Sequence, residues 1–275
     1  MTEVIAERTR LNEVQINGKR HYELSNGDVV PSVTTFLDVL PKPALDKWRV
    51  KVTAEYAIDK VDDWAKLDAT SQLIVPRMPR DATVDMMKGA PYSDTSARDN
   101  GNIVHKIFED LFVGREPLVP KGFERAVDLF EQFNKDFEIE VLYIEPQLVN
   151  EKLKYSGSTD GIFRINGKLT VIDWKAGRGL YGSTAYQATA YARCEYIVTE
   201  TGEEVEMPQV DQLMGVWLRS SGYAPYPLEY SQDTWDVVRM ARRLYDLTAR
   251  EWDYRGKPMI ANALKSPGPE WGLTS

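Results

Sequence analysis

The chain has 275 residues, with 34 lysines and arginines against 42 aspartates and glutamates, which gives a formal net charge of −8. This balance argues against a protein that coats nucleic acid broadly, since such affinity comes from many Lys and Arg contacts to phosphate, but it is compatible with a local basic groove. The single cysteine, Cys194, excludes a disulfide framework and a four-cysteine zinc or iron–sulfur site within the chain.

The N-terminal part is expected to contain hairpins followed by a helix. Asn17-Gly18 and Asn26-Gly27 are dipeptides that favour tight turns between short strands. Apolar side chains recur at helical spacing over residues 44–60, whereas residues 73–95 show weak periodicity and are expected to be mobile or to contact substrate. The start of the chain lacks the apolar core of a signal peptide, and no apolar run is long enough to span a membrane, so we expect a cytoplasmic protein without membrane contact.

The rest of the chain alternates between helical and extended patterns. The expected helices cover residues 98–113, 121–137, 183–198 and 232–253, and the expected strands cover residues 139–149, 154–165, 168–175 and 211–218. The tail after Tyr254 is rich in Pro and Gly and is predicted to be irregular. The sequence contains no phosphate-binding loop of the Walker type, so we expect neither ATP binding nor motor activity.

One expected hairpin contains two aspartates where apolar side chains are usual. Asn166-Gly167 is the preferred dipeptide of a two-residue type I′ turn, so Ile165 should pair with Lys168. Counting outward from this turn, Asp160 should pair with Asp173. Their Cβ atoms would then lie about 4.5–5.5 Å apart, and the two charges would repel by roughly 3 kcal/mol at an effective dielectric constant near 20. A bound cation would resolve this repulsion. A β-bulge, which is common near active sites, would shift the pairing.

Lys175 follows Asp173 by two residues, and it therefore lies on the same face of the expected strand. The chain contains no other Asp-x-Lys. Taken alone, each of the three residues could be an ordinary surface residue. Together, Asp160, Asp173 and Lys175 have the chemistry of a phosphodiester site that uses a divalent metal, because hard carboxylate oxygens suit Mg²⁺ or Mn²⁺. The lysine could orient or deprotonate a water, or stabilise charge on a phosphate.

Further polar residues are candidates for the same site. His105 lies on an expected helix, with Glu109 one turn later on the same face. A lone histidine on a helix is usually structural, and a polar helix face is usually solvated, but beside the aspartates both could bind metal. Glu145 lies in the strand before the hairpin and is followed by Pro146, which suggests a strand edge or bulge; it is a further possible acidic ligand.

Four short motifs follow one another along the chain. They are Gly101 with His105, Gly157 with Asp160, Asp173-Trp174-Lys175 on the next strand, and Gln187 with Tyr191 on one face of the following helix. In this order they resemble the PD-(D/E)xK nuclease superfamily, and within it the RecB-like exonuclease branch. The resemblance covers residues 95–195. Residues 31–35, with Leu45 and Trp48, are also similar to the front of phage-borne members.

The resemblance implies a restriction-endonuclease-like α/β core, a central mixed β-sheet flanked by helices. We assign this core to residues 96–254, with an N-terminal extension of hairpins and helix packed on it at residues 1–95 and an irregular tail at residues 255–275. The resemblance also implies residue roles: metal ligation by His105, Asp160, Asp173 and the carbonyl of Trp174, action of Lys175 on the attacking water, and support of the strand or the active-site geometry by Gln187 and Tyr191. Some relatives carry an iron–sulfur cluster or are fused to helicases, and this chain has neither feature.

The function expected from the sequence is that of a Mg²⁺- or Mn²⁺-dependent deoxyribonuclease, with exonuclease action favoured, in recombination, repair or phage DNA metabolism. Lys154, Arg164 and Arg178 are candidate contacts to DNA phosphates. Arg164 is preferred, because strand alternation places it on the face of Asp160. The alternatives are an endonuclease with the same site, a DNA-binding or assembly protein without catalysis, and a phosphohydrolase of nucleotides. The sequence leaves open whether single- or double-stranded DNA is preferred. It also leaves open whether the chain forms a homo-oligomer or binds a recombination partner protein.

Overall fold

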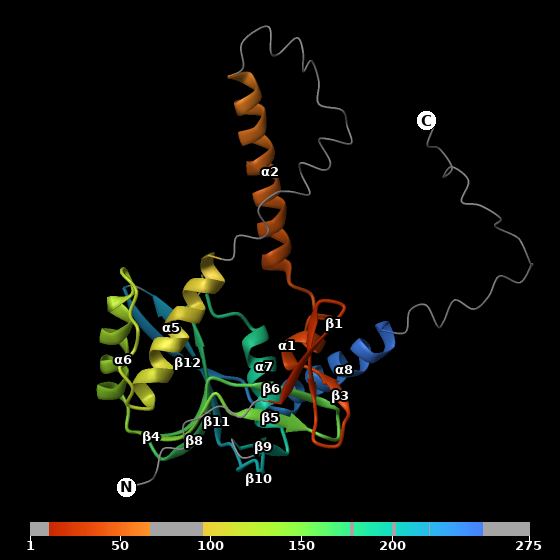
Figure 1. Cartoon of the computed structure of the whole chain (residues 1–275), viewed down its shortest axis with the longest axis vertical. Coiled ribbons are helices and arrows are strands. Elements are labelled where there is room, and N and C mark those ends of the chain that lie inside the picture. Colours follow the sequence, from red (N-terminus) through yellow and green to blue (C-terminus); the bar gives the residue numbers. More distant parts are fainter. Residues whose placement is uncertain (1–10, 67–95, 177–178, 200–201, 220, 250–275) are drawn as a thin grey trace, which may run out of the picture.

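The computed structural model describes residues 11–66, 96–176, 179–199, 202–219 and 221–249 (Figure 1). These residues form a mixed α/β fold with a central mixed sheet and helices on both of its faces, as expected. The expected segment at residues 73–95, the tail at residues 255–275 and Arg178 lie outside the described residues. No helix within the described ranges is both long enough and apolar enough to cross a lipid bilayer.

The central sheet has five strands in the order β12-β11-β8-β7-β4. These strands are β4 (Ile139–Ile144), β7 (Gly161–Ile165), β8 (Lys168–Lys175), β11 (Gln212–Arg219) and β12 (Gly222–Leu228). β8 and β11 run parallel, and all other neighbours run antiparallel. The connection from β8 to its parallel neighbour therefore crosses over the sheet, and a helix lies in this connection, as is usual for parallel strands.

Two hydrophobic clusters attach helices to opposite faces of this sheet. On one face, α5 (Ser96–Phe112) and α6 (Glu124–Asp136) pack on β8 and β11 through aromatic side chains such as Phe108 and Trp174. On the other face, α7 (Ser183–Ala192) covers β8 and β11, and it also contacts α1 (Val33–Leu37) and α8 (Gln232–Thr248). Figure 1 shows α5 and α6 together on one side and α1, α7 and α8 on the other.

Two smaller sheets complete the described fold. One has the order β10-β9-β5-β6 and contains β5 (Gln147–Asn150), β6 (Tyr155–Ser158), β9 (Tyr196–Val198) and β10 (Glu204–Glu206). The other has the order β1-β2-β3 and contains β1 (Asn12–Ile16), β2 (Lys19–Glu23) and β3 (Val29–Pro31). The expected turn at Asn17-Gly18 is present, with both residues at positive φ. Strands β2 and β3 contact β6 of the other small sheet.

The N-terminal segment contributes to the core that supports α7. Val33 and Phe36 of α1 are fully buried, and Phe36 packs on Tyr155 of β6 with ring centroids 5.1 Å apart. The helix expected at residues 44–60 is present as α2 (Pro43–Ala65). It projects away from the sheets (Figure 1) and leaves Val50 and Ile58 exposed.

Several element boundaries differ from the sequence prediction. The expected strand at residues 139–149 is broken at Glu145 and Pro146, and the one at residues 154–165 is broken before Gly161, so each contributes to two different sheets. The expected helix at residues 183–198 ends at Ala192, after which the chain forms β9. The prediction missed β10 and also β12, whose two prolines suit it to the edge of the sheet.

Candidate active site

The hairpin of β7 and β8 has the predicted turn and register. Asn166 and Gly167 have φ values of 48° and 80°, as a type I′ turn requires. Ile165 lies opposite Lys168, which confirms the pairing predicted from the sequence. The right-handed twist of such a turn matches that of the two strands, so the register is fixed locally and without a bulge between β7 and β8.

The two aspartates lie where this ladder ends. The last pair is Gly161 with Ile172, so Asp160 and Asp173 are the next residues outward on the two strands. Asp160 itself is in a bend before β7 and does not pair in the ladder, which departs from the predicted pairing. The Thr159 hydroxyl donates a 3.0 Å hydrogen bond to the Ile172 carbonyl and holds this bend on β8. The sequence interpretation overlooked Thr159, because only the structure shows that this threonine is buried against β8.

The Asp160 carboxylate joins β8 to helix α5. Its Oδ2 accepts a 2.6 Å hydrogen bond from the backbone N–H of Trp174, and its Oδ1 lies 3.0 Å from Nδ1 of His105. These contacts bring the first three motifs together, although 55 residues separate His105 from Asp160 in the sequence. Trp174 is anchored by its ring, which packs edge-on against Phe108 and Phe133 with centroids 5.1 Å away in each case.

Asp173 and Lys175 form an ion pair at the end of β8. Nζ of Lys175 donates a 2.8 Å hydrogen bond to Oδ1 of Asp173 and lies 2.7 Å from Oδ2. The Asp173 side chain is only 5% exposed, whereas that of Lys175 is 31% exposed. Despite the close ammonium, no donor among the described residues is aligned for a hydrogen bond with Oδ2 of Asp173, and this oxygen is buried. A cation bound at this oxygen would have to share it with the Lys175 ammonium or displace that ammonium.

The four charged groups shift one another's pKa values. Burial alone would lower the pKa of His105, but the Asp160 carboxylate outweighs it and raises that pKa. Burial acts to raise the pKa of Asp160, yet His105, Lys175 and the Trp174 N–H together lower it. Burial, reinforced by the charge of Asp160, raises the pKa of Asp173 to about 6 despite the nearby Lys175. The pKa of Lys175 is raised, because the two carboxylates outweigh its own burial.

The donor set fits a hard divalent cation in its chemistry. Asp160 and Asp173 supply carboxylate oxygens, and Oδ2 of Asp173 has no aligned donor within the described part of the chain. However, no group of three or more His, Cys, Asp or Glu side chains in the described ranges is already arranged to hold a metal. The reason is visible in the contacts: the His105 ring and the Lys175 ammonium lie against the carboxylates, where a cation would compete with them.

Gln187 and Tyr191 are brought to the same site by α7. Nε2 of Gln187 donates a 3.2 Å hydrogen bond to the Tyr191 hydroxyl. The Tyr191 ring packs on Gly157, where an added Cβ would lie 2.8 Å from Cε1 of the ring. Burial raises the pKa of Tyr191, and the charges of Asp173 and Asp160 add to this effect. Gly157 and Tyr191, which belong to two different motifs, are thus in contact, and the charges of both aspartates act on the pKa of Tyr191.

The two further acidic candidates have different positions. Glu109 is buried, and its carboxylate pairs with Lys106 at 3.0 Å and with Arg115 at 3.3 Å, so these cations engage it on α5. Glu145 adopts a left-handed backbone conformation with φ of 46°, and its N–H donates to the Asp160 carbonyl at 3.1 Å. Glu145 therefore lies beside the Asp160 bend, whereas Glu109 is held in ion pairs with Lys106 of its own helix and with Arg115 just beyond the end of that helix.

The candidate phosphate contacts are not gathered at the site. Lys154 forms an exposed ion pair with Asp28 at 2.7 Å. Arg164 pairs with Glu140 on the neighbouring strand at 2.9 Å, and it lies four residues from Asp160, or about 13 Å along an extended strand. Strand alternation predicted Arg164 on the face of Asp160, but Asp160 lies in the bend before β7, and Arg164 lies near the turn end of that strand. Arg178 lies outside the described residues.

Comparison with known proteins gives only distant similarities. No family model matches the chain, and no curated protein matches it. Among solved structures, the chain in the crystal structure of SSO0001 has 21% sequence identity to this chain, with a TM-score of 0.28. The match covers 44% of this chain and 56% of the SSO0001 chain, which is less than two thirds of its length. The alkaline exonuclease LHK-Exo from Laribacter hongkongensis is 8% identical with a TM-score of 0.29, over 56% of this chain and 81% of that one. Similarities at this level assign no function to the chain.

Proposed function

We propose that this chain is a metal-dependent nuclease that hydrolyses phosphodiester bonds of DNA at the end of β8. The observation that carries this proposal is the meeting of two carboxylates, Asp160 and Asp173, with Lys175 at one strand end. Structural ion pairs normally match each acid with a base on the surface. Here one carboxylate is buried with an oxygen that lacks an aligned donor among the described residues, and its pKa is raised to about 6. Perturbed groups of this kind cluster at functional sites.

The residues that would hold Mg²⁺ or Mn²⁺ are Asp160, Asp173, His105 and the carbonyl of Trp174. When bound, such a cation polarises the scissile phosphate and lowers the pKa of a coordinated water. His105 must release its proton before a ring nitrogen can act as a ligand, since only the neutral imidazole binds metal. The backbone N–H of Trp174 fixes the orientation of the Asp160 carboxylate.

Lys175 is placed to act on the phosphate or on the attacking water. Its raised pKa keeps the ammonium protonated near neutral pH in the arrangement described. A protonated lysine stabilises negative charge that develops on phosphate oxygens and can orient a water through its N–H groups. Gln187 and Tyr191 of α7 are joined by a hydrogen bond and would support the geometry of the site. The resemblance of the four motifs to the RecB-like exonuclease branch favours exonuclease action, in recombination, repair or phage DNA metabolism.

The test uses end-labelled single- and double-stranded DNA with Mg²⁺ and then with Mn²⁺. The wild-type protein should release short products, and Lys175→Ala should lower the rate by at least about a hundredfold. Lys168→Ala is a matched control, because it removes an exposed lysine from the other end of the same strand. Intact DNA with both metals would contradict the proposal, and a protein that still shifts the DNA in a gel would then be a binding or assembly protein. Preferential hydrolysis of mononucleotides would instead indicate a nucleotide phosphohydrolase.

A further inference from the structure

Strand β11 places two more residues on the face that carries Asp173 and Lys175. β11 runs parallel to β8, with Gly215 opposite Asp173 and Trp217 opposite Lys175. Side chains directly opposite one another in a ladder lie on the same face of a sheet, and this face repeats every second residue. Arg219, two residues beyond Trp217 at the end of β11, is therefore on this face as well.

Among the described residues, the Arg219 side chain contacts an aromatic ring and not an acid, as that of Arg193 does beside Tyr230. Its guanidinium lies 4.9 Å from the centroid of the Trp217 ring, and no carboxylate within the described ranges forms an ion pair with it. By contrast, Arg164 and Arg239 each pair with an acid on the surface. Stacking on an aromatic ring orients the planar guanidinium and leaves its N–H groups available at the edge. Such an arrangement suits the binding of an external anion.

The surface beside this pair is open. On the edge strand β12, Ala224 lies opposite Trp217 and Gly222 lies opposite Arg219. A Cβ added at Gly222 would meet no atom of the described chain within 4 Å. Arg219 is exposed, and Trp217 is half-buried. The small residues on β12 thus leave the guanidinium accessible from the edge of the sheet.

Arg219 lies close enough to Lys175 for both side chains to contact one DNA strand. Neighbouring strands lie about 4.8 Å apart and a strand rises about 3.3 Å per residue, so the Cα atoms of Lys175 and Arg219 are separated by roughly 8 Å. At this separation the two long side chains can reach neighbouring phosphates of the same strand.

We propose that Arg219, oriented by Trp217, binds a backbone phosphate of the DNA strand next to the scissile phosphate. The proposal rests on the nuclease function proposed above and adds a binding contact that the sequence motifs do not include. Arg219 supplies the charge, and Trp217 is a positioning residue that holds the guanidinium toward the site. Contacts of this kind fix the register of the strand and carry no base specificity.

The test measures DNA binding by fluorescence anisotropy with labelled single- and double-stranded oligonucleotides in EDTA, between 50 and 200 mM salt. Arg219→Ala should weaken binding by about three- to tenfold and reduce the slope of log affinity against log salt by about 0.7–0.9, the loss of one phosphate contact. Arg219→Lys should keep the slope. Trp217→Leu should weaken binding less than Arg219→Ala, and the double variant should bind no more weakly than Arg219→Ala, because the tryptophan acts through the arginine.

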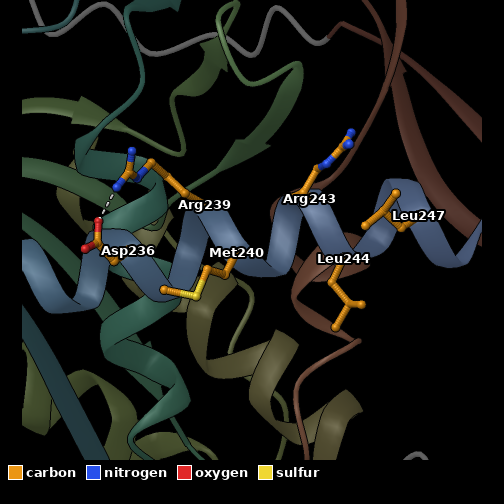
Figure 2. A pocket seen from close by; sticks show the side chains of 6 residues that line it. All are labelled: Asp236, Arg239, Met240, Arg243, Leu244 and Leu247. Atoms are coloured by element: carbon orange, nitrogen blue, oxygen red, sulfur yellow. Dashed lines mark hydrogen bonds and ion pairs between the residues drawn. The ribbon is translucent and has the colours of Figure 1, made fainter.

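Arg243→Ala is the matched control. Arg243 lies on α8, where Figure 2 shows it beside a shallow pocket lined by Met240 and Leu244. Like Arg219 it has no ion-pair partner among the residues that the structure describes, and it is exposed. Its removal should leave the salt slope unchanged.

Two results would overturn the proposal: wild-type affinity and slope in Arg219→Ala, or an equal loss in Arg243→Ala. Circular dichroism of each variant establishes that it is folded. Arg219→Lys tests the same phosphate contact with the positive charge retained. If the wild-type protein cleaves and binds DNA while Arg219→Ala matches it, only this inference fails. If the wild-type protein neither binds nor cleaves DNA, the nuclease proposal fails as well.

Discussion

Asp160 and Asp173 differ in what each carboxylate contacts. Asp160 accepts a backbone hydrogen bond and lies beside His105, so the pKa of Asp160 is lowered despite its burial. Among the described side chains, the Lys175 ammonium is the one that pairs with Asp173, and burial raises the pKa of Asp173 to about 6. Two nearby acids whose pKa values are pushed apart can serve different roles in one reaction. Near neutral pH without a further cation, Asp173 is the acid that more readily holds a proton.

Replacing Asp173 with asparagine should change how stability depends on pH. The raised pKa means that the native state holds more protons than the unfolded chain between pH 3.8 and about 6, so wild-type stability falls as pH rises through this window. Asp173→Asn lacks this loss. The free energy of unfolding of the variant, relative to wild type, should therefore increase between pH 4 and pH 7 by on the order of 2 kcal/mol. Urea denaturation at several pH values measures it, and parallel stability profiles for the two proteins would refute it.

The elements show which features the sequence encodes locally. The register of β7 and β8 was predictable because Asn166-Gly167 sets it within the hairpin itself. The sequence marked Glu145 and Pro146 as a strand edge or bulge, but it did not show that the segments on either side of Glu145 and of Asp160 join different sheets, because tertiary packing decides this. The contact of His105 with Asp160 depends on the packing of α5 beside the end of β8. Resemblance of motifs suggested that contact, whereas periodicity alone could not.

Two motif glycines, Gly157 and Gly101, are packed differently. Substitution by alanine should therefore lower stability and activity at position 157 but not at position 101. In Gly157→Ala the added Cβ would lie 2.8 Å from the Tyr191 ring and 3.3 Å from Val33, which should cost about 1–3 kcal/mol of stability. Displacement of Tyr191 should also lower DNA cleavage by about tenfold or more. Thermal unfolding and the end-labelled DNA assay measure the two effects.

Gly101→Ala is the control for this substitution. A Cβ at Gly101 meets no described atom within 4 Å. Because alanine favours a helix over glycine, this variant should equal wild type in stability or exceed it by up to about 1 kcal/mol. Equal destabilisation of both variants would show that contact with Tyr191 is not what requires glycine at position 157.

At the scale of the whole molecule, the topology gathers distant segments at one end of the central sheet. α5 on one face contributes His105, and α7 on the other contributes Gln187 and Tyr191. The N-terminal helix α1 packs beside the residues that α7 contributes, since Val33 lies next to Gly157, which contacts Tyr191. The alternation of helices and strands in the sequence predicted the layers. The short strand β9 was missed because its apolar residues were included in the helix expected at residues 183–198, and β10 and the edge strand β12 were missed because they lack a clear apolar pattern.

The topology of the DNA substrate distinguishes the two modes of cleavage. An exonuclease requires an end, so linear plasmid should be degraded by the wild-type protein with Mg²⁺ or Mn²⁺ while covalently closed plasmid stays intact. Gel electrophoresis of both forms in the same reaction makes the comparison. Conversion of the closed form to a nicked circle would show endonuclease action by the same residues.

The proposed function requires Asp160 and Asp173 together to bind a divalent cation. The most direct measurement is a calorimetric titration of wild type and Asp160→Asn with Mn²⁺ at pH 8, where His105 is more fully deprotonated than at lower pH. We expect saturable binding to wild type and an affinity at least about tenfold lower in the variant. Wild-type protein that binds no Mn²⁺, or a variant that binds it equally well, would show that these two carboxylates do not form a metal site.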